Sequence, residues 1–485
     1  MTLQARLRNT LLRSGAHAVE ADGVWHTWDE LDRVARSLAT ALDARGIPAS
    51  TPLGWISRNR PDHLAVLFGL LAAGRSLVVI SSVQSAERIA LEVERLALPV
   101  IIADRADWNS DALVQACRRR SAIGLAVDGG IVVDGGTGEV GEAAAEQSLT
   151  VLTSGTTGPP KRIPLSMSAL EAAAIDMELL EAEGDVPGQT RPPFIMFWPL
   201  ANISGLYYTM PTGLGARPLV LMPKFSVEVW ADAVERYRPR LLWLPPAAIR
   251  MVLDANVPKS RLASARALRY GASPLDAHVR EVFEQRYGIP ILSQYGATEF
   301  AGIVACWTLA DHARWMHAKR GSIGRARPGM RLRVVDPQTG LELPPGSLGQ
   351  LQVHAPRVGP DWQTTNDIAH IDGDGFVYLE GRADDAINRG GFKVVPEEVA
   401  AVLRQYPGVR DAAVVGIPDE RLGRIPVAAI EAVAPDGLAI EDLQAFARAR
   451  LLAYQVPARY VVAAKLPRTP TLKIDRQRVL RLFDT

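Results

Sequence analysis

Cysteine, an excess of charge of either sign and long apolar runs are all scarce in this sequence of 485 residues. The two cysteines, Cys117 and Cys306, are too few for a disulfide framework and lack the Cys-x-x-Cys spacing of zinc and redox sites. The formal net charge is +1, whereas a nucleic-acid-binding chain normally carries a strong basic surplus. We therefore expect no nucleic-acid partner, and we expect a reducing, cytoplasmic location.

Segments for targeting or membrane insertion are also missing from the pattern. Residues 1–13 mix apolar side chains with arginines and contain no apolar run of the kind that a signal peptide needs. The longest apolar stretch, residues 64–73, is too short to span a bilayer. A content of 48% hydrophobic and 22% charged residues is typical of a soluble globular protein. Because the length exceeds one ordinary core, we expect at least two domains.

Strand-like and helix-like segments alternate through the first part of the chain. Residues 53–57, 77–80 and 100–102 are continuous apolar runs typical of buried parallel strands. Residues 24–46 predict a strand and then a helix that is capped at Thr27 and ends at a glycine. This alternation predicts a mostly parallel sheet with helices on its faces. We interpret the glycine-rich residues 124–141 as a surface excursion.

The strongest local signal is the segment 148–161, Ser-Leu-Thr-Val-Leu-Thr-Ser-Gly-Thr-Thr-Gly-Pro-Pro-Lys. Its first half suits a buried strand, while its glycines allow close backbone approach and its two prolines prevent a strand ladder. Exposed N–H groups, hydroxyls and one lysine together suit a polyphosphate, although the spacing is not that of a Walker loop and a plain polar turn is the alternative. The phosphate-binding residues predicted here are Thr153, Ser154, Gly155, Thr156, Thr157, Gly158 and Lys161.

Four further strings follow that loop in order. Gln-Tyr-Gly-Ala-Thr-Glu at 294–299 offers an aromatic face for a purine and a carboxylate of the kind that joins phosphate oxygens in a magnesium shell. Thr-Thr-Asn-Asp at 364–367, Glu-Gly-Arg-Ala-Asp at 380–384 and Pro-Thr-Leu-Lys at 470–473 come next. Each string alone is weak evidence, with a turn aspartate or an exposed lysine as the plain alternative. Their order along one chain makes the set strong.

In this order the strings resemble the adenylate-forming superfamily, which comprises acyl- and aryl-CoA synthetases, nonribosomal adenylation domains and firefly luciferase. The resemblance extends over about residues 24–476. It implies an α/β fold with a large N-terminal adenylation domain, residues 1–382, of parallel-type sheets with flanking helices and a small β-barrel-like part. A small, mobile α+β C-terminal domain, residues 383–485, would follow and would rotate about a hinge at Asp384.

For the nucleotide, the resemblance implies that the glycine-rich loop grips the β- and γ-phosphates of ATP. Tyr295 is expected to stack on the adenine, Asp367 to bind both ribose hydroxyls, and Arg382 to contact the ribose and phosphate. The remaining positions implied near the base and the acyl group are Gly271, Ala272, Ser273, Gln294 and Gly296.

For the reaction, the resemblance implies that Lys473 is the catalytic cation, that Thr298 contacts the α-phosphate and that Glu299 ligates Mg²⁺. Attack of an acid on the α-phosphate needs no general base, because the carboxylate is already ionised. The obstacle is charge repulsion, so catalysis consists of positioning and neutralisation. Coenzyme A is the expected co-substrate.

The chain departs from the family pattern at several places. Ala201 and Asn202 stand where an aromatic residue and a histidine are common, Asn366 replaces a glycine, and Leu472 replaces the glycine before the lysine. Asn202 has the alternative of merely capping the next helix. Asn366 suits left-handed backbone geometry if that is needed there, while Leu472 restricts the loop that moves Lys473.

The predicted acid pocket has no obvious carboxylate, which disfavours an α-amino acid as the substrate. Its members are mostly small and uncharged, which leaves room for an aromatic or medium-length acyl group, with a long-chain tunnel still open. They are Ala201, Asn202, Gly205, Tyr207, Ala272, Ala301 and Gly302.

The predicted activity is ATP-dependent activation of a carboxylic acid to acyl-AMP, with release of pyrophosphate, followed by acyl transfer to coenzyme A. Two alternatives keep the first step: an amide bond synthetase that uses an amine, and an adenylation enzyme that loads a carrier protein. A non-catalytic nucleotide-binding relative would be expected to lack Glu299 or Lys473, and both are present.

Overall fold

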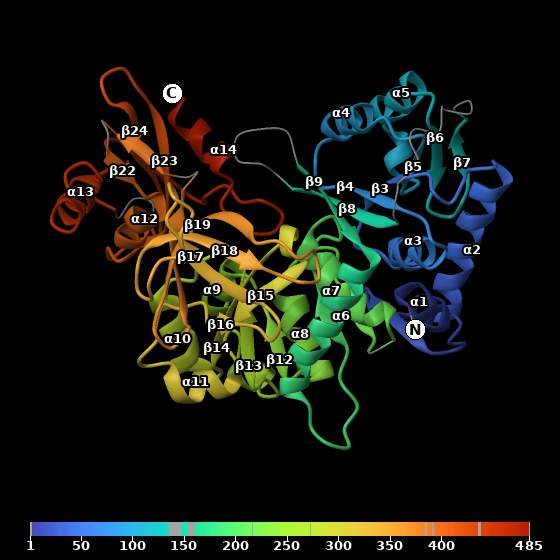
Figure 1. The fold of residues 1–485 in the computed structure, drawn as a ribbon, viewed down its shortest axis with the longest axis horizontal. Helices are drawn as coiled ribbons and strands as arrows, with labels where there is room; N and C mark the ends of the chain where they lie inside the picture. The colour runs from blue at the N-terminus through green and yellow to red at the C-terminus, as the bar shows by residue number, and fades with distance from the viewer. Residues whose placement is uncertain are drawn as a thin grey trace.

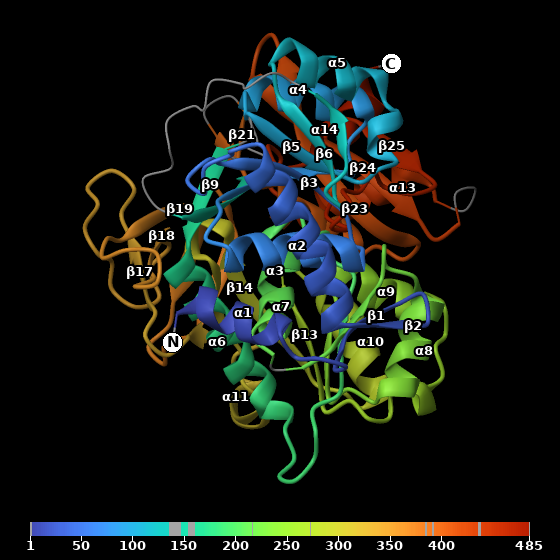
Figure 2. The ribbon, with the colours of Figure 1, turned by 90° about the vertical axis from the view of Figure 1, so that its right-hand side faces the viewer.

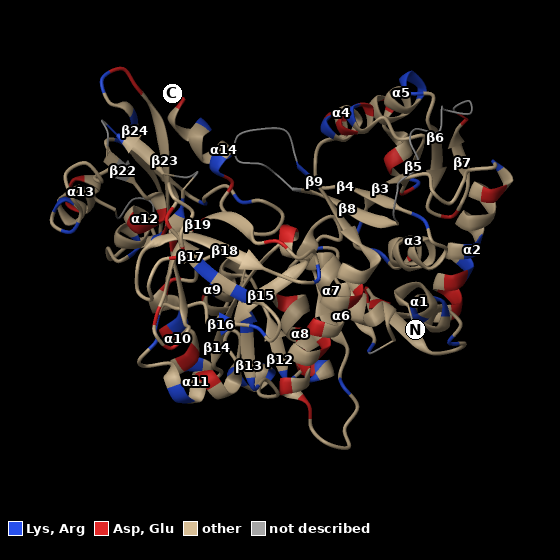
Figure 3. Cartoon of the chain, viewed as in Figure 1, with Lys and Arg blue, Asp and Glu red and all other residues tan. Residues whose placement is uncertain are grey.

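In the computed structural model, five β-sheets with helices packed on them make up most of the described chain (Figure 1). The structure describes residues 2–134, 147–153, 161–215, 217–271, 273–383, 386–389, 392–434 and 438–484. No helix within these ranges combines the length and the apolar character needed to cross a membrane. Both acidic and basic side chains occur on surface helices such as α4 (Ala86–Leu96) and α11 (Leu309–Trp315), in keeping with the small net charge (Figure 3).

The first sheet has seven strands in the order β7-β6-β5-β3-β4-β8-β9. Its strands are β3 (Leu53–Ser57), β4 (Leu77–Ser81), β5 (Val100–Ala103), β6 (Ile123–Ala126), β7 (Ile131–Val133), β8 (Ser148–Thr153) and β9 (Lys161–Ser166). Strands β3, β4, β5, β6 and β8 run parallel to one another, whereas the edge strands β7 and β9 are antiparallel to β6 and β8 respectively. The parallel strands predicted at residues 53–57, 77–80 and 100–102 are therefore confirmed.

Helices cover both faces of this sheet, because successive strand residues point to opposite sides. Trp55 packs with the core that includes α2 (Trp28–Ala44) and α3 (Pro61–Ala72), whereas Ile56 packs with α4 and α5 (Asp111–Arg119). Figures 1 and 2 show the two helix pairs on opposite sides of the strands. Thr27 occupies the cap position of α2 as predicted, but its side chain makes no capping hydrogen bond.

The prediction of a surface excursion at residues 124–141 is wrong for its first part. Residues 123–126 form the buried strand β6, and residues 131–133 form the edge strand β7. A Cβ atom on Gly124 would lie 2.6 Å from the ring of Trp108, so this glycine serves close packing rather than a flexible turn. Residues 135–141 lie outside the described part of the chain.

Two further sheets complete the large α/β region. One has the order β10-β11-β1-β2 and the other the order β12-β13-β14-β15-β16, in which β12, β13 and β14 are parallel. Their strands are β1 (His17–Ala21), β2 (Val24–Thr27), β10 (Phe194–Met196), β11 (Leu219–Leu221), β12 (Leu241–Trp243), β13 (Ala267–Tyr270), β14 (Ile291–Ala297), β15 (Gly302–Cys306) and β16 (Arg325–Ala326). The helices are α1 (Leu3–Leu11), α6 (Met167–Glu181), α7 (Ile203–Gly213), α8 (Val227–Tyr237), α9 (Pro246–Asp254), α10 (Ala277–Tyr287) and α11.

A fourth sheet is antiparallel and consists of β17 (Arg331–Val335), β18 (Gly349–His354), β19 (Gln363–Ile371) and β20 (Val377–Arg382). Strand β18 alternates between buried and partly exposed residues, and Leu351, Val353 and Ala369 form the buried face. This sheet brings Asp367 and Arg382 opposite each other on neighbouring strands.

The residues from 387 onward form a compact α+β region. Strands β21 (Ile387–Arg389), β22 (Phe392–Val394), β23 (Val409–Asp419), β24 (Gly423–Ala432) and β25 (Tyr460–Ala463) make one sheet, with α12 (Pro396–Arg404), α13 (Ile440–Arg448) and α14 (Arg476–Leu480). Both of its apolar clusters contain only residues of this region. Residues 418–426 form most of the end of a long β23–β24 hairpin. Figures 1 and 2 place this region above the β12–β16 sheet.

Candidate active site

The side chains of Tyr295, Asp367 and Arg382 meet although they come from different strands. The Tyr295 hydroxyl, on β14, donates a hydrogen bond to the Asp367 carboxylate, on β19. The Arg382 guanidinium, on β20, lies 3.6 Å from the same carboxylate. These three predicted nucleotide-binding residues therefore lie together, and we call them the nucleotide group.

Thr365 supports this group, and sequence reasoning did not assign it a role. Its hydroxyl accepts the Asp367 backbone N–H at 3.0 Å and donates to the Leu351 carbonyl at 2.9 Å. Burial, and next the charge of Asp367, raise the pKa of Tyr295 well above its ordinary value. Tyr295 therefore stays a neutral phenol and a hydrogen-bond donor at any ordinary pH.

Lys473 lies within range of the charges of the nucleotide group. Burial by the surrounding protein, and next the positive charge of Arg382, lower the pKa of its ammonium, while the negative charge of Asp367 opposes this shift. The Lys473 side chain nevertheless keeps solvent-exposed surface. It therefore combines a destabilised positive charge with access to a ligand.

A tight turn carries this lysine, and we call residues 467–475 the lysine loop. The Leu472 N–H donates to the Thr469 carbonyl at 2.8 Å, and the Thr469 N–H donates to the Lys473 carbonyl at 2.7 Å. Leu472 has φ +63°, in the left-handed region. This is the bulge position of a three-residue hairpin, where glycine is usual, and a leucine there costs about 1–2 kcal/mol of backbone strain.

Ion pairs around the buried Asp411 hold the base of the lysine loop. Arg468 pairs with Asp411 at 2.5 Å and donates to the Leu472 carbonyl at 3.3 Å, while Asp411 also pairs with Arg404 at 2.9 Å. Burial disfavours the charge on Asp411, but Arg404, Arg250 and Arg468 outweigh it and lower the pKa of the carboxyl. Asp411 and Arg468 are 57 residues apart, and no local sequence signal links them.

Thr298 and Glu299 lie on a short 3-10 helix, Thr298–Phe300, directly after β14. Thr298 is buried and Glu299 is exposed. The chain then turns through two residues of positive φ, Ala301 at +52° and Gly302 at +131°. This turn fixes where the Glu299 carboxylate stands relative to Tyr295.

Arg357, another residue that sequence reasoning missed, holds the same turn from behind. Its guanidinium donates to the Phe300 carbonyl at 2.6 Å and the Ile303 carbonyl at 2.7 Å, on either side of the turn. Its third contact is Asp176 at 3.2 Å, which also pairs with Arg327. The Arg357 side chain is only 3% exposed, so these bonds rigidify the backbone that carries Thr298 and Glu299.

Several predicted acid-pocket residues also meet. A Cβ atom on Gly302 would lie 2.5 Å from the Tyr207 ring, and the Tyr207 hydroxyl donates to Asp176 at 3.2 Å. Asn202 stands at the cap position of α7, but its side chain makes no capping hydrogen bond. Gly205 does not open space: its Cβ would lie 2.2 Å from the Pro199 carbonyl oxygen, so its small size serves backbone packing.

Gln294 and the glycines near it form the wall behind Tyr295. The Gln294 amide nitrogen donates to the Tyr208 hydroxyl at 2.8 Å, while its amide oxygen is buried with no hydrogen-bond partner among the described residues. A Cβ atom on Gly271 would lie 2.8 Å from the Gln294 side chain. A Cβ atom on Gly296 would lie 2.3 Å from the Gly302 carbonyl oxygen. Both glycines therefore allow close approach of neighbouring strands.

The other predicted residues are placed as follows. Thr153 and Lys161 face each other at the ends of β8 and β9, and Lys161 is exposed. Ser273 is described and partly exposed. Asn366 lies within β19 and has no positive φ, so this position does not need left-handed geometry. Outside the described residues lie Ser154, Gly155, Thr156, Thr157, Gly158, Ala272 and Asp384.

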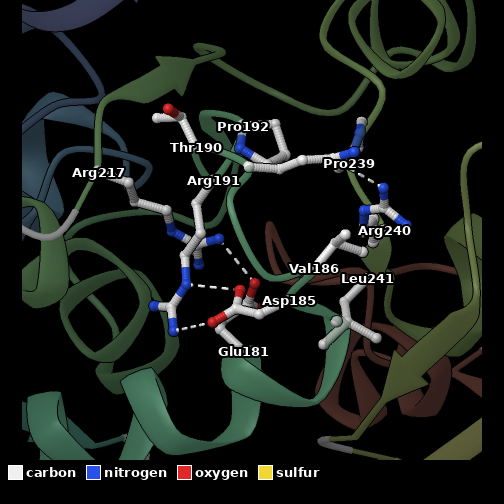
Figure 4. A pocket seen from close by; sticks show the side chains of 12 residues that line it. Glu181, Asp185, Val186, Thr190, Arg191, Pro192, Arg217, Pro239, Arg240 and Leu241 are labelled. Carbon is white, nitrogen blue, oxygen red and sulfur yellow. Dashed lines mark hydrogen bonds and ion pairs between the residues drawn. The ribbon is translucent and has the colours of Figure 1, made fainter.

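The cavity of Figure 4 is a different place. Its charged side chains largely pair with one another: Arg217 with Glu181 at 2.6 Å and Arg191 with Asp185 at 2.6 Å. It lies by the end of α6 and the long segment that follows, at the bottom of Figure 1. None of the predicted site residues lines it, so we treat it as part of the scaffold.

The chain is similar to known proteins over nearly its whole length. The AMP-binding enzyme family model matches residues 9–360, and the model of the AMP-binding enzyme C-terminal domain matches residues 398–473. The indoleacetate–CoA ligase of Aromatoleum aromaticum is 28% identical over 94% of this chain and 93% of that protein.

Two solved structures show the fold. ATP-bound MatB from Rhodopseudomonas palustris has a TM-score of 0.83 and 22% identity, covering 100% of this chain and 99% of that one. The amide bond synthetase McbA from Marinactinospora thermotolerans has a TM-score of 0.80 and 24% identity, covering 99% of each chain. The predicted α/β fold, with a large N-terminal and a small C-terminal part, is thereby confirmed.

Proposed function

This chain belongs to the family of AMP-binding enzymes, and from that premise we propose that it is an AMP-forming ligase. It joins a carboxylic acid to AMP and then passes the acyl group on. One arrangement carries the proposal: Lys473 lies beside the group of Tyr295, Asp367 and Arg382. A carboxylate suited to a ribose diol and an ammonium suited to a phosphate are thus held together.

In the first step, an oxygen of the acid carboxylate attacks the α-phosphorus of ATP. The bond from that phosphorus to the bridging oxygen breaks, and pyrophosphate leaves with the electron pair. The transition state spreads negative charge over the phosphoryl oxygens, so positioned cations lower the barrier. Lys473 supplies a cation there, and Thr298 supplies a hydroxyl donor on the turn that Arg357 holds.

The residues present fit a magnesium ion held mainly by phosphate oxygens. Glu299 is exposed, and a single carboxylate is the usual protein share of such a shell. Bound Mg²⁺ would add Lewis-acid charge stabilisation. Within the described ranges, no group of three or more His, Cys, Asp and Glu side chains is arranged to hold a metal by protein ligands alone.

We propose coenzyme A as the acceptor in the second step. Its thiol sulfur would attack the acyl carbon of the adenylate, and AMP would leave as the acyl–phosphate oxygen bond breaks. The support is the curated relative that uses coenzyme A, which is similar over 94% of this chain. An amine would give an amide by the same chemistry, and a carrier-protein thiol would give a bound thioester. The likeness to an amide bond synthetase concerns the fold.

The proposed acid is aromatic or of medium length. Tyr207 and Gly302 are in contact beside the turn of Glu299, and the buried rings of Trp198 and Tyr208 lie 4.6 Å apart behind them. Asn202 adds one uncharged amide without a capping hydrogen bond. An apolar wall with a single neutral polar group suits an acyl chain without a second charge.

We also propose that residues 1–382 and 383–485 move as two domains about Asp384. Two separate apolar cores after residue 387 support this division. Gly381 lies against Val395, since a Cβ atom there would be 2.4 Å from that side chain. The two parts therefore touch closely beside the proposed hinge.

Pyrophosphate release tests the proposal. The purified protein is incubated with ATP and Mg²⁺ and a panel of aryl-acetic, cinnamic-type, medium-chain and α-amino acids, with products identified by mass spectrometry. We expect acyl-AMP from an aromatic or medium-chain acid, and a thioester when coenzyme A is added. Amides formed in parallel reactions with amines, without a thioester, would establish the amine acceptor instead. Release of ADP with any acid, or absence of acyl-AMP across the panel, would refute the proposed ligase.

A further inference from the structure

Leu472 has an apolar contact that no other described residue of its region shares. Apolar clusters from residue 387 onward are built from their own region, and Ile474, two residues away, packs into one of them. Leu472 instead packs against the large core, whose buried members all lie between Leu3 and Cys306. Among the described residues after Val358, it is the only apolar side chain recorded on that core.

The same residue has an unfavourable backbone conformation. At φ +63° a leucine occupies a region that favours glycine. A strained residue of this kind persists when surrounding contacts hold it. Here the turn bonds of Thr469 and the Arg468 bond to the Leu472 carbonyl hold the backbone, and the large core holds the side chain.

The contact adjoins the lysine. Leu472 and Lys473 are neighbours in the chain, and Lys473 is close enough to Arg382 and Asp367 for their charges to shift its pKa. A side chain anchored on the large core therefore limits where the Lys473 backbone can move. Arg468 and Asp411 tie the other side of the loop to the C-terminal region, so that region is tied to the large core through this loop.

We propose that Leu472 is a positioning residue that anchors the lysine loop on the large region and favours the arrangement in which Lys473 faces the nucleotide. The inference rests on the proposed function for its catalytic consequence. The anchoring itself is a property of the protein without bound ligands and does not depend on the proposed function. The side chain supplies the anchor, and the left-handed backbone is tolerated because of it.

Three substitutions separate the side chain from the backbone. Leu472→Ala removes the contact and keeps a Cβ atom at positive φ, whereas Leu472→Gly removes the contact and also the strain. Leu472→Met keeps an unbranched apolar side chain that can reach the same core. Leu452→Ala is the matched control, because Leu452 belongs to the same region and is 58% exposed.

The first readout needs no substrate. Nitroxide labels on Val229→Cys of α8 and Ala445→Cys of α13, both exposed positions, report the distance between the two regions. The native Cys117 and Cys306 are buried, so they compete little for the label. We expect one dominant distance in the wild type and in Leu472→Met and Leu452→Ala. Leu472→Ala and Leu472→Gly should both shift the population to a broader, longer distribution.

The second readout is the rate of each half-reaction. Acyl-adenylate formation should fall about tenfold in Leu472→Ala and Leu472→Gly, as loss of a partly buried leucine contact implies. Acyl transfer from preformed adenylate should fall less, and the KM for ATP should change little. Leu472→Met should restore the first half-reaction.

Each outcome decides the inference. Wild-type distance distributions in both the alanine and glycine variants would overturn it, because the side chain would then hold nothing. A change in the glycine variant alone would also overturn it, since backbone freedom would then control the loop. If the wild type released no pyrophosphate with any acid, the proposed function would fail while the distance result still judged the anchor.

Discussion

The nucleotide group and the lysine loop lie side by side, but different kinds of structure hold them. Tyr295, Asp367 and Arg382 are fixed by strand positions: Asp367 and Arg382 are cross-strand partners, and Tyr295 pairs with Ala305 where β14 runs antiparallel to β15 in another sheet. The lysine loop depends on a turn with a left-handed leucine and on buried ion pairs beneath it.

This difference teaches which half of the site tolerates change. A strand position is set by many backbone hydrogen bonds and by the buried face of the sheet, so a single substitution seldom shifts it. A turn held by one ion-pair network and one apolar contact can be displaced by a single residue. The proposed movement of Lys473 between two half-reactions is easier on the second kind of support.

The largest expected effect comes from removing the cation while leaving the nucleotide group intact. In Lys473→Ala we expect acyl-adenylate formation to fall by about 10²–10³, the usual cost of losing one preorganised charge stabiliser. ATP affinity, measured by calorimetry, should stay within a few-fold of the wild type. Lys465→Ala, an exposed lysine of the same region, should leave both unchanged. An equal loss of ATP affinity and of the rate of acyl-adenylate formation would contradict the separate roles of the nucleotide group and the lysine loop.

The second effect concerns the ion pairs under the lysine loop. Asp411→Asn leaves Arg404 and Arg468 without their shared carboxylate, and we expect the unfolding free energy to fall by about 3 kcal/mol. Denaturant unfolding at pH 7 measures it, with the exposed Asp442→Asn as the control.

The pH dependence of the same variant has a defined sign. The pKa of Asp411 is lowered in the folded protein, so its stabilisation is complete above the unfolded value of about 4 and is lost as pH falls through the lowered folded value. The stability gap between wild type and Asp411→Asn should therefore narrow only at acidic pH. A gap that stayed constant down to pH 2 would argue against this role.

A smaller effect is expected at the nucleotide group. Tyr295→Phe removes the hydroxyl that donates to Asp367, and a hydrogen bond to a charged group contributes about 1.5 kcal/mol or more. We expect the dissociation constant for ATP to rise about tenfold while the rate at saturating ATP changes little. Tyr406→Phe, in the C-terminal region, should change neither. If Tyr295→Phe lowered the rate at saturating ATP but kept the ATP affinity, the hydroxyl would act in the chemical step instead of in binding.

The smallest expected effect is a shift in the pH above which acyl-adenylate formation slows. This shift depends on both the nucleotide group and the lysine loop. Lys473 must be protonated to act as a cation, so the rate falls as pH rises through its lowered pKa. Removing the opposing charge in Arg382→Met should move this limit to higher pH. Removing the favourable charge in Asp367→Asn should move it to lower pH. Shifts in the same direction, measured at saturating ATP, would show that another group sets the limit.

Much of the fold could be predicted from the sequence because its signals are local. The apolar runs at residues 53–57, 77–80 and 100–102 became parallel strands, and the helix predicted after Thr27 became α2. The glycine-rich residues after 123 were misinterpreted, because close packing against Trp108 and loop flexibility both favour glycine. The order of short motifs predicted the family, which the family models confirm. The boundary at residue 382 and the hinge stay predictions.

The sequence by itself determined which chemical groups are available: a glycine-rich hydroxyl loop, Tyr295, Asp367, Arg382 and Lys473, in that order along the chain. Only the tertiary structure decided what holds them. Thr365, Arg357 and Asp411 act through partners on other elements, with Asp411 57 residues from Arg468 and Arg357 54 residues from Ile303. No local pattern encodes such pairs, because the contacts exist only after the sheets have formed.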